Sequence, residues 1–161
     1  MSGPQLTLSQ YFTRDHRNCD AQWAEVEAAS EGGGAGKLAS AWGRFEQSMR
    51  THMQKEEEVL FPAVEAATGM SGGGPTEVMR SEHNQMRGLL DQMAQAFARD
   101  DHDELLDQGD TLLMLIQQHN QKEEHILYPM CENALDAQWT ESGFRGVDDA
   151  FLLGARLQVD F

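Results

Sequence analysis

The sequence is short of basic residues, cysteines and long apolar runs, and each shortage excludes a class of protein. Twelve Lys and Arg stand against 27 Asp and Glu, which gives a formal net charge of −15. Such a chain repels phosphate backbones and anionic lipids, so we expect it to bind neither nucleic acid nor a membrane surface. No apolar run approaches the ~20 residues of a membrane span. Two cysteines are too few for a disulfide framework, and the start of the chain lacks signal-peptide features, so we expect a cytoplasmic protein.

β-branched residues are also scarce, whereas Ala, Glu, Gln, Leu and Met are abundant, and this favours helix over strand. Glycine-rich stretches at 32–36 and 69–75 predict loops. Apolar residues recur at three- and four-residue steps in four segments, 7–30, 38–67, 76–100 and 103–136. Short connections between such segments predict an all-α fold, an up-down-up-down antiparallel four-helix bundle.

We expect this bundle to occupy residues 1–136 and a C-terminal extension to occupy residues 137–161. The extension contains too many apolar residues for a free tail, because it includes four aromatic residues, one of them in a Phe-Leu-Leu run at 151–153. Either it packs on the bundle or it forms the interface of a homodimer.

An internal repeat divides the bundle into two copies of a helical hairpin. Residues 52–62 read HMQKEEEVLFP and residues 119–129 read HNQKEEHILYP, with seven of eleven positions identical at an offset of 67. The same offset places His16 on His83. Each hairpin therefore has one histidine on its first helix and a His-x-x-x-Glu pair on its second.

The lengths of the helices bring these histidines to one level. In the first hairpin, about 14 residues lead away from His16 and about 14 lead back to His52, so both legs cover ~21 Å. The second hairpin has legs of about 17 and 16 residues between His83 and His119. Four histidines then face the centre of the bundle, with the two glutamates one turn further along on the same faces.

Imidazoles and carboxylates that converge in a helical core require a partner. Buried carboxylates need pairing or a metal, and buried histidines need a hydrogen bond or an ion. One ion does not comfortably take all six side chains, whereas two ions do, each with two histidines and with both glutamates bridging. Mixed imidazole and carboxylate ligation suits iron, manganese or zinc. The predicted metal ligands are His16, His52, Glu56, His83, His119 and Glu123.

This pattern resembles the hemerythrin and HHE cation-binding family over about residues 8–136. The resemblance implies two iron ions in a non-haem di-iron centre with an oxo or hydroxo bridge, for which manganese or zinc could substitute. It also implies binding or sensing of O₂, or handling of NO, iron or peroxide. Respiratory members have a fifth histidine, one turn from the histidine on the third helix. In this chain the residues one turn from His83 are Met79 and Arg87, so one iron should have fewer nitrogen ligands and more open positions.

Several alternatives stay open. The chain is expected to be a hemerythrin-like protein that binds O₂ or a related small molecule. It could instead be a di-iron peroxidase, oxidase or NO-handling enzyme, or an iron storage or delivery protein. A metal-free helical interaction module is disfavoured by the six-residue pattern.

The neighbours of the predicted ligands carry further expectations. Glu57, Glu58 and Glu124 are interpreted as outer-face charges, and Cys19 as a buried inert thiol or a neighbour of the metals. Asp20 and Arg87 are equivalent under the repeat. They either form a salt bridge over the site, with Asp20 as an alternative metal ligand, or reach solvent through helix rotation.

Overall fold

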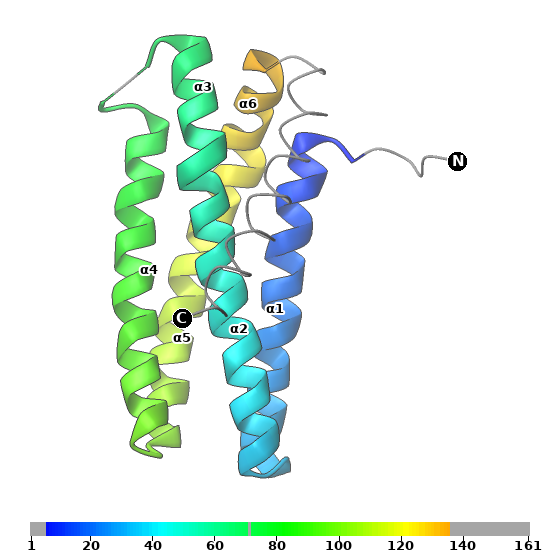
Figure 1. Cartoon of the computed structure of the whole chain (residues 1–161), viewed down its shortest axis with the longest axis vertical. Helices are drawn as coiled ribbons and strands as arrows, with labels where there is room; N and C mark the ends of the chain where they lie inside the picture. The colour runs from blue at the N-terminus through cyan, green and yellow to red at the C-terminus, as the bar shows by residue number, and fades with distance from the viewer. Residues whose placement is uncertain (1–5, 71, 136–161) are drawn as a thin grey trace, which may run out of the picture.

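A computed structural model of the chain describes residues 6–70 and 72–135, and four helical rods make up its fold (Figure 1). The first rod is α1 and the third is α4, whereas the second and fourth each contain a π-helical turn. In chain order the elements are α1 (Leu8–Gly32), α2 (Ala35–Lys55), η1 (Glu56–Leu60), α3 (Phe61–Thr68), α4 (Pro75–Ala98), α5 (His102–Lys122), η2 (Glu123–Leu127) and α6 (Tyr128–Ala134). The predicted all-α bundle is confirmed.

The two helices of each hairpin pack against each other along their length. α1 lies against α2, and α4 lies against α5, while α1 also contacts α5 and α6, and α2 contacts α4. This arrangement, visible in Figure 1, is the predicted up-down-up-down topology, with α1 diagonal to α4. The predicted domain limits stay a prediction, because the extension at 137–161 lies outside the described residues.

The helix ends follow local capping chemistry. Thr7 caps α1 by accepting a hydrogen bond from the backbone of Gln10, whose side chain accepts in return from the Thr7 backbone. Asp101 caps α5 through the backbone N–H of Glu104. Gly69 ends α3 in the left-handed conformation, at φ 71°, which glycine adopts without steric cost.

A π-helical turn precedes a proline in both long rods. The backbone N–H groups of Phe61 and Tyr128 bond to the carbonyls of Glu56 and Glu123, five residues back. Pro62 and Pro129 follow at once and have no N–H to donate to the preceding turn. The wider turn accommodates each proline, and the helix then resumes. Single π turns of this kind occur often at functional sites, and both begin here at a predicted ligand.

Two apolar clusters lie on either side of the level of the histidines. One lies toward the α1–α2 and α4–α5 turns and includes Trp23, Phe45 and Leu112. The other lies toward α3 and α6 and includes Phe12 and Leu60. These clusters bury the layer of polar side chains that sits between them.

Packing in the first of these clusters depends on one glycine. A Cβ atom at Gly109 would meet the ring of Trp23 at 2.2 Å. The indole of α1 therefore packs directly on the backbone of α5, and any larger residue at position 109 would displace it.

Among the described residues, no helix combines the length and the apolar character needed to cross a membrane.

Candidate metal centre

All six predicted ligands lie in the polar layer between the two apolar clusters. Each of the four rods contributes one histidine, and the two rods with π turns also contribute a glutamate each. The six side chains are almost completely buried, with no more than 5 % of any residue exposed. The structure thus brings together the complete set, while the ligand roles themselves remain a prediction.

The histidines form two pairs, one within each hairpin. The Nε2 atoms of His16 and His52 lie 3.1 Å apart. The Nε2 atoms of His83 and His119 are also 3.1 Å apart. The two Nε2 atoms of each pair thus point toward a common position, as the ligands of one metal ion do.

Each glutamate joins the two pairs. Glu56 Oε2 lies 3.5 Å from Nε2 of His52 and 3.2 Å from Nε2 of His83. Glu123 reaches Nε2 of His16 through Oε2 at 3.0 Å and Nε2 of His119 through Oε1 at 2.8 Å. A carboxylate placed between two histidine pairs is positioned to bridge two ions.

The donor set fits two metal ions rather than a hydrogen-bonded protein core. One group of ligand atoms within 4.8 Å of one another comes from His16, His52 and both glutamates, and a second comes from His83, His119 and the same glutamates. Glu56 Oε2 and Glu123 Oε1 are buried beside the imidazoles of His83 and His119, at 3.2 and 2.8 Å, but neither oxygen accepts a well-aligned hydrogen bond within the described part of the chain. Unsatisfied buried carboxylate oxygens are costly, and coordination of a cation would satisfy both.

The charges of the metal-free site reinforce this interpretation. Burial acts to lower the pKa of His16, but hydrogen bonding and charge attraction from Glu123 outweigh it and raise the pKa to about 9. Burial likewise acts to lower the pKa of His83, but hydrogen bonding and charge attraction from Glu56 and Glu57 outweigh it and raise the pKa to about 9. Burial would raise the pKa of Glu123, yet the adjacent imidazoles of His119 and His16 hold it well below its usual range. Without metal, protons on the imidazoles take the place of the cations.

The outer nitrogen of every histidine is held by a carboxylate. His16 Nδ1 lies 2.8 Å from Glu124, and His83 Nδ1 lies 2.9 Å from Glu57. His119 Nδ1 lies 2.7 Å from Glu82, and His52 Nδ1 lies 3.3 Å from Asp15. Such carboxylates fix the tautomer and orientation of metal-binding histidines and make Nε2 a better donor.

A basic side chain compensates each outer carboxylate. Lys55 contacts Asp15 at 3.3 Å and Lys122 contacts Glu82, in equivalent places of the two hairpins. Arg17 contacts Glu124 at 3.3 Å, and Arg87 contacts Glu57 at 2.6 Å. The outer shell is therefore close to neutral, and the charges of the two inner glutamates remain for the ions.

Tyr128 adds a hydroxyl group that the other hairpin lacks. Its hydroxyl donates to Glu56 Oε1 at 2.6 Å and lies 2.9 Å from Glu123 Oε2 and 3.1 Å from His16 Nε2. Its ring stacks on His16, just as Phe61, its equivalent under the repeat, stacks on His83. Burial and the two glutamates hold the pKa of Tyr128 well above its usual range, so the phenol is a neutral donor.

The structure corrects one expectation about the outer residues and selects between two alternatives for Asp20. Glu57 and Glu124 are not merely outer-face charges, because they bind the histidines, and only Glu58 among the three is exposed. Asp20 is exposed and contacts Arg17 at 3.7 Å, so it neither pairs with Arg87 nor approaches the site.

The sequence analysis missed three residues of the site. Tyr128 was not identified, although it replaces Phe61 in the repeat. Asp15 and Glu82 directly precede the histidines of the first helices in both hairpins, and this shared acid was the signal that could have identified them.

A small enclosed cavity adjoins the four histidines. Its volume is about 10 Å³, close to the space that admits one water molecule. Besides the histidines, its walls are mostly apolar and come from the first apolar cluster. They are Cys19, Met49, Met53, Met86 and Ile116, with Asn120 at one side. The cavity is thus suited to a molecule of very few atoms next to Nε2 of the histidines.

Comparison with known proteins gives several partial relatives. The DNA nickase of Nostoc sp. is 24 % identical over 136 residues, which are 84 % of this chain and 36 % of the nickase. The iron-sulfur cluster repair protein YtfE of Cronobacter sakazakii is 39 % identical over 54 residues, or 34 % of this chain and 24 % of that protein. The same protein from Salmonella paratyphi B is 40 % identical over 45 residues, 28 % of this chain and 20 % of that protein. The chain thus spans about a third or less of these relatives, and no solved structure matches it.

The family comparison covers most of the described bundle. The hemerythrin HHE cation binding domain matches residues 7–131, from the N-cap of α1 into α6. This range contains the first three rods, the fourth as far as residue 131, all six residues of the buried cluster and every outer carboxylate described above. The chain belongs to the hemerythrin HHE cation-binding family, and it is a metal-binding protein.

Proposed function

We propose that the chain is a hemerythrin-like di-iron protein that binds or senses O₂ or a related small molecule such as NO or peroxide. The observation that carries this proposal is the position of Glu56 and Glu123, each of which lies between one histidine of each pair. His16 and His52 would hold one iron, and His83 and His119 the other. When bound, two irons joined by carboxylates supply reversible electron exchange with small oxidants.

The chain's own residues would prepare such a centre for a small ligand. The four outer carboxylates hold the Nδ1 atoms, so that Nε2 faces the ions. Tyr128 donates a hydrogen bond to Glu56 and fixes one of its oxygens. The apolar walls of the small cavity exclude bulk water from the side of the histidines.

A di-iron enzyme is the second candidate, and the number of histidines favours it. The cluster has four histidines and two shared carboxylates, so each ion would have four protein ligands and positions left open. Open coordination positions are typical of reactive metal sites. Met79 and Arg87, at the expected places of a fifth histidine, do not supply one, and Arg87 instead binds Glu57.

The relatives suggest a third candidate function, iron delivery, and also an action on DNA, which we do not adopt. The similarity to iron-sulfur cluster repair proteins fits a role in iron delivery, with the metal as cargo. The nickase similarity involves 36 % of that protein, and a net charge of −15 opposes contact with a phosphate backbone. We therefore propose no action on DNA.

An absorbance spectrum of the anaerobically reconstituted protein, before and after O₂, separates these candidates. A stable band that disappears when O₂ is removed supports binding or sensing. Rapid irreversible oxidation without loss of iron supports an enzyme, whereas release of iron to a chelator on oxidation supports delivery.

A further inference from the structure

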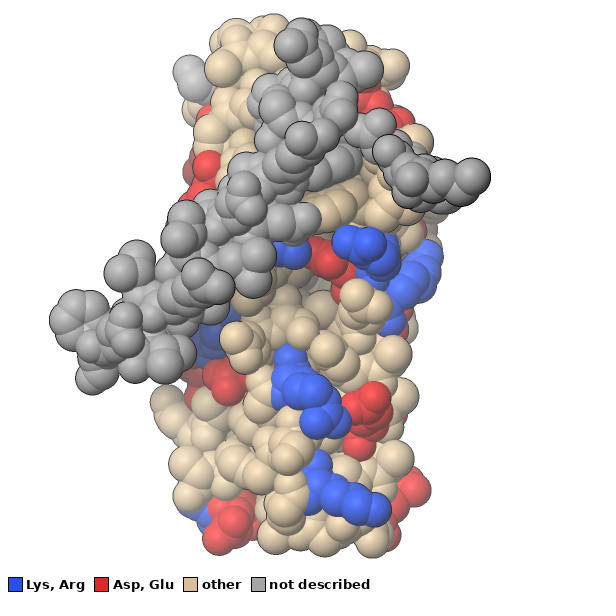
Figure 2. Space-filling view, turned by 45° about the vertical axis from the view of Figure 1, so that its right-hand side comes forward, with Lys and Arg blue, Asp and Glu red and all other residues tan. Residues whose placement is uncertain are grey.

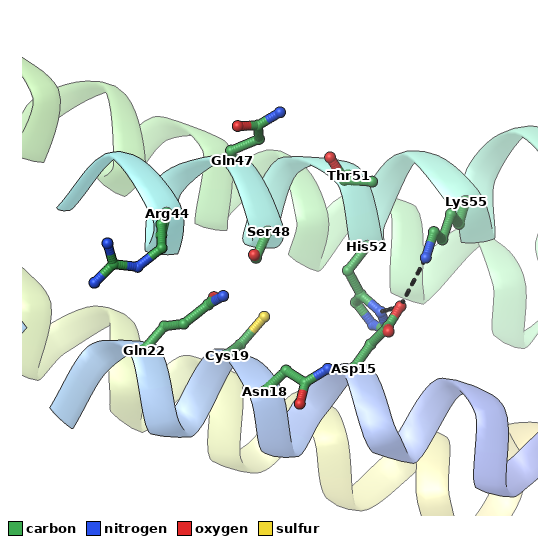
Figure 3. A pocket seen from close by; sticks show the side chains of 10 residues that line it. All are labelled: Asp15, Asn18, Cys19, Gln22, Arg44, Gln47, Ser48, Thr51, His52 and Lys55. Carbon is green, nitrogen blue, oxygen red and sulfur yellow. Dashed lines mark hydrogen bonds and ion pairs between the residues drawn. The ribbon is translucent and has the colours of Figure 1, made fainter. Parts of the chain in front are cut away.

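A polar pocket opens between α1 and α2 beside one half of the centre (Figure 3). Its volume is about 310 Å³, and its lining is almost entirely hydrophilic. Arg44 lies toward one end of the pocket and His52 toward the other, with Cys19 between them. Small-molecule sites start at a volume of about 300 Å³, so the pocket has room for a small polar molecule and its water.

Two residues separate this pocket from the small cavity at the histidines. Cys19 and His52 line both spaces, and they are the residues common to the two linings. His52 is held by Asp15 on its outer side. Cys19 is therefore the movable part of the wall, since its side chain has one rotatable bond and ends in a single atom. In Figure 3 its sulfur points into the gap between the helices, opposite Ser48.

The internal repeat shows that this opening belongs to one hairpin only. In the second hairpin, Met86 stands in place of Cys19, Leu89 in place of Gln22, and Leu115 in place of Ser48. All three pack in or against the first apolar cluster. The same surface between α4 and α5 is thus filled with large apolar side chains, while the surface between α1 and α2 has small or polar ones.

The polar atoms of the pocket are ready for a hydrophilic guest. Gln22 Oε1 is buried and has no hydrogen-bond partner in the described ranges, and Figure 3 shows its amide between the two helices. A buried acceptor of this kind needs a donor, which a polar molecule in the pocket would supply.

The charge around the pocket is compatible with neutral or singly negative molecules. Six of the ten Lys and Arg residues at 6–70 and 72–135 lie on α1 and α2. Figure 2 brings the right-hand side of Figure 1 forward, and Lys and Arg side chains follow one another along that face. In the pocket itself, Lys55 pairs with the lining carboxylate of Asp15, and Arg44 pairs with Glu25 at 2.6 Å. The opening is therefore close to neutral on a strongly acidic protein, so it repels a small anion less than the rest of the surface does.

We propose that this pocket is the route by which small hydrophilic ligands, neutral or singly negative, reach the ion held by His16 and His52, with Cys19 as its gate. The inference rests on the proposed metal centre. It gives the two ions different access, because the half-site of His83 and His119 lies behind Met86.

Azide is a suitable probe, because it is small, singly negative and binds ferric iron. The rate at which azide associates with the oxidised, iron-loaded protein is measured in Cys19→Met and Ser48→Leu. These substitutions introduce the side chains that the second hairpin has at the equivalent positions, Met86 and Leu115. Both should slow association about ten-fold or more, and Cys19→Ala should speed it. Ser40→Leu, the same change about two turns earlier on α2, should leave it unchanged.

A second measurement does not need iron. In the metal-free protein, iodoacetamide should alkylate Cys19 several-fold more slowly in Ser48→Leu than in the wild type or Ser40→Leu. Cys131, which is buried in the other apolar cluster, serves as the internal reference by mass spectrometry.

Equal azide rates in fully loaded wild-type, Cys19→Met and Ser48→Leu proteins would overturn the route, even with the metal centre intact. Equal alkylation rates of Cys19 in Ser48→Leu and Ser40→Leu would overturn it as well. Failure of the wild-type protein to bind iron would instead contradict the proposed function, and the alkylation experiment would still decide the route.

Discussion

The hydroxyl of Tyr128 lies 2.6 Å from Oε1 of Glu56, across the bundle in the other hairpin. This contact breaks the two-fold symmetry of the repeat, because the equivalent residue of the first hairpin, Phe61, has no hydroxyl. The two histidine pairs are alike in distance and burial, so the phenol is one of the features by which the two half-sites differ.

Replacement of Tyr128 by Phe should make the two hairpins alike at this position. Glu56 Oε1 would lose its donor, so the metal-free protein should lose about 1–3 kcal/mol of unfolding free energy. Chemical denaturation of the metal-free protein measures this loss. The metal-loaded protein should lose less, since the ions also satisfy the carboxylates.

The exchange variant Tyr128→Phe with Phe61→Tyr is the matched control. It moves the hydroxyl to the equivalent place in the first hairpin and should recover part of the lost stability. If Tyr128→Phe alone is as stable as the wild type, the hydroxyl does not stabilise Glu56.

The carboxylates at the outer nitrogens of the histidines should tune metal affinity. Glu57→Gln and Glu124→Gln replace the partners of His83 and His16 and should weaken metal binding about 10–100-fold. Glu58→Gln is the control, because Glu58 is exposed and binds Gln54 instead of a histidine. Competition with a chelator measures the three affinities, and equal values for Glu57→Gln and Glu58→Gln would contradict the role.

The two glutamates between the histidine pairs should be equally important. Glu56→Ala and Glu123→Ala should each lower metal content severely, because each removes a ligand from both ions. They should also lower the thermal midpoint of the loaded protein by similar amounts. Metal analysis together with thermal denaturation tests this, and a substitution that leaves both values unchanged would remove that residue from the bridging pair.

Metal binding should release protons and strengthen as pH rises. In the metal-free protein the pKa values of His16 and His83 are about 9, above the ordinary 6.5. Ions bind neutral imidazole, so at neutral pH loading should expel at least about two protons. Calorimetric titration in buffers of different ionisation enthalpy counts them, and a value near zero would mean that these histidines are not ligands.

The same shifts predict an opposite trend for the metal-free protein. A folded-state pKa that is raised from 6.5 to about 9 stabilises the fold fully below pH 6.5, and this contribution is lost as pH rises through 9. Denaturation of metal-free protein should therefore show falling stability across this range, while metal affinity increases. Rising stability of the metal-free protein over the same range would contradict the charge assignment.

The sequence was sufficient to predict the bundle and the cluster of six side chains. The bundle follows from helical periodicity and short connections. The cluster follows from the repeat, because equal helix lengths return His16 and His52 to one level whatever the details of packing. Neither inference depends on the rotation of a helix about its axis.

The surroundings of the site do depend on that rotation, and here the sequence was insufficient. Asp20 and Arg87 have the same spacing from a histidine, yet Asp20 faces solvent and Arg87 reaches Glu57. Glu57 and Glu124 follow the inner glutamates directly, and only the π-helical turns that begin there set their direction. The pocket between α1 and α2 depends likewise on how closely two helices approach.

The stoichiometry of iron in the anaerobically reconstituted protein tests the central claim most directly. Elemental analysis against protein concentration should give two irons per chain in the wild type. It should give about one or fewer in Glu56→Ala, in which both ions lose a ligand. One iron per chain in the wild type, or none, would contradict a centre in which two glutamates join two histidine pairs.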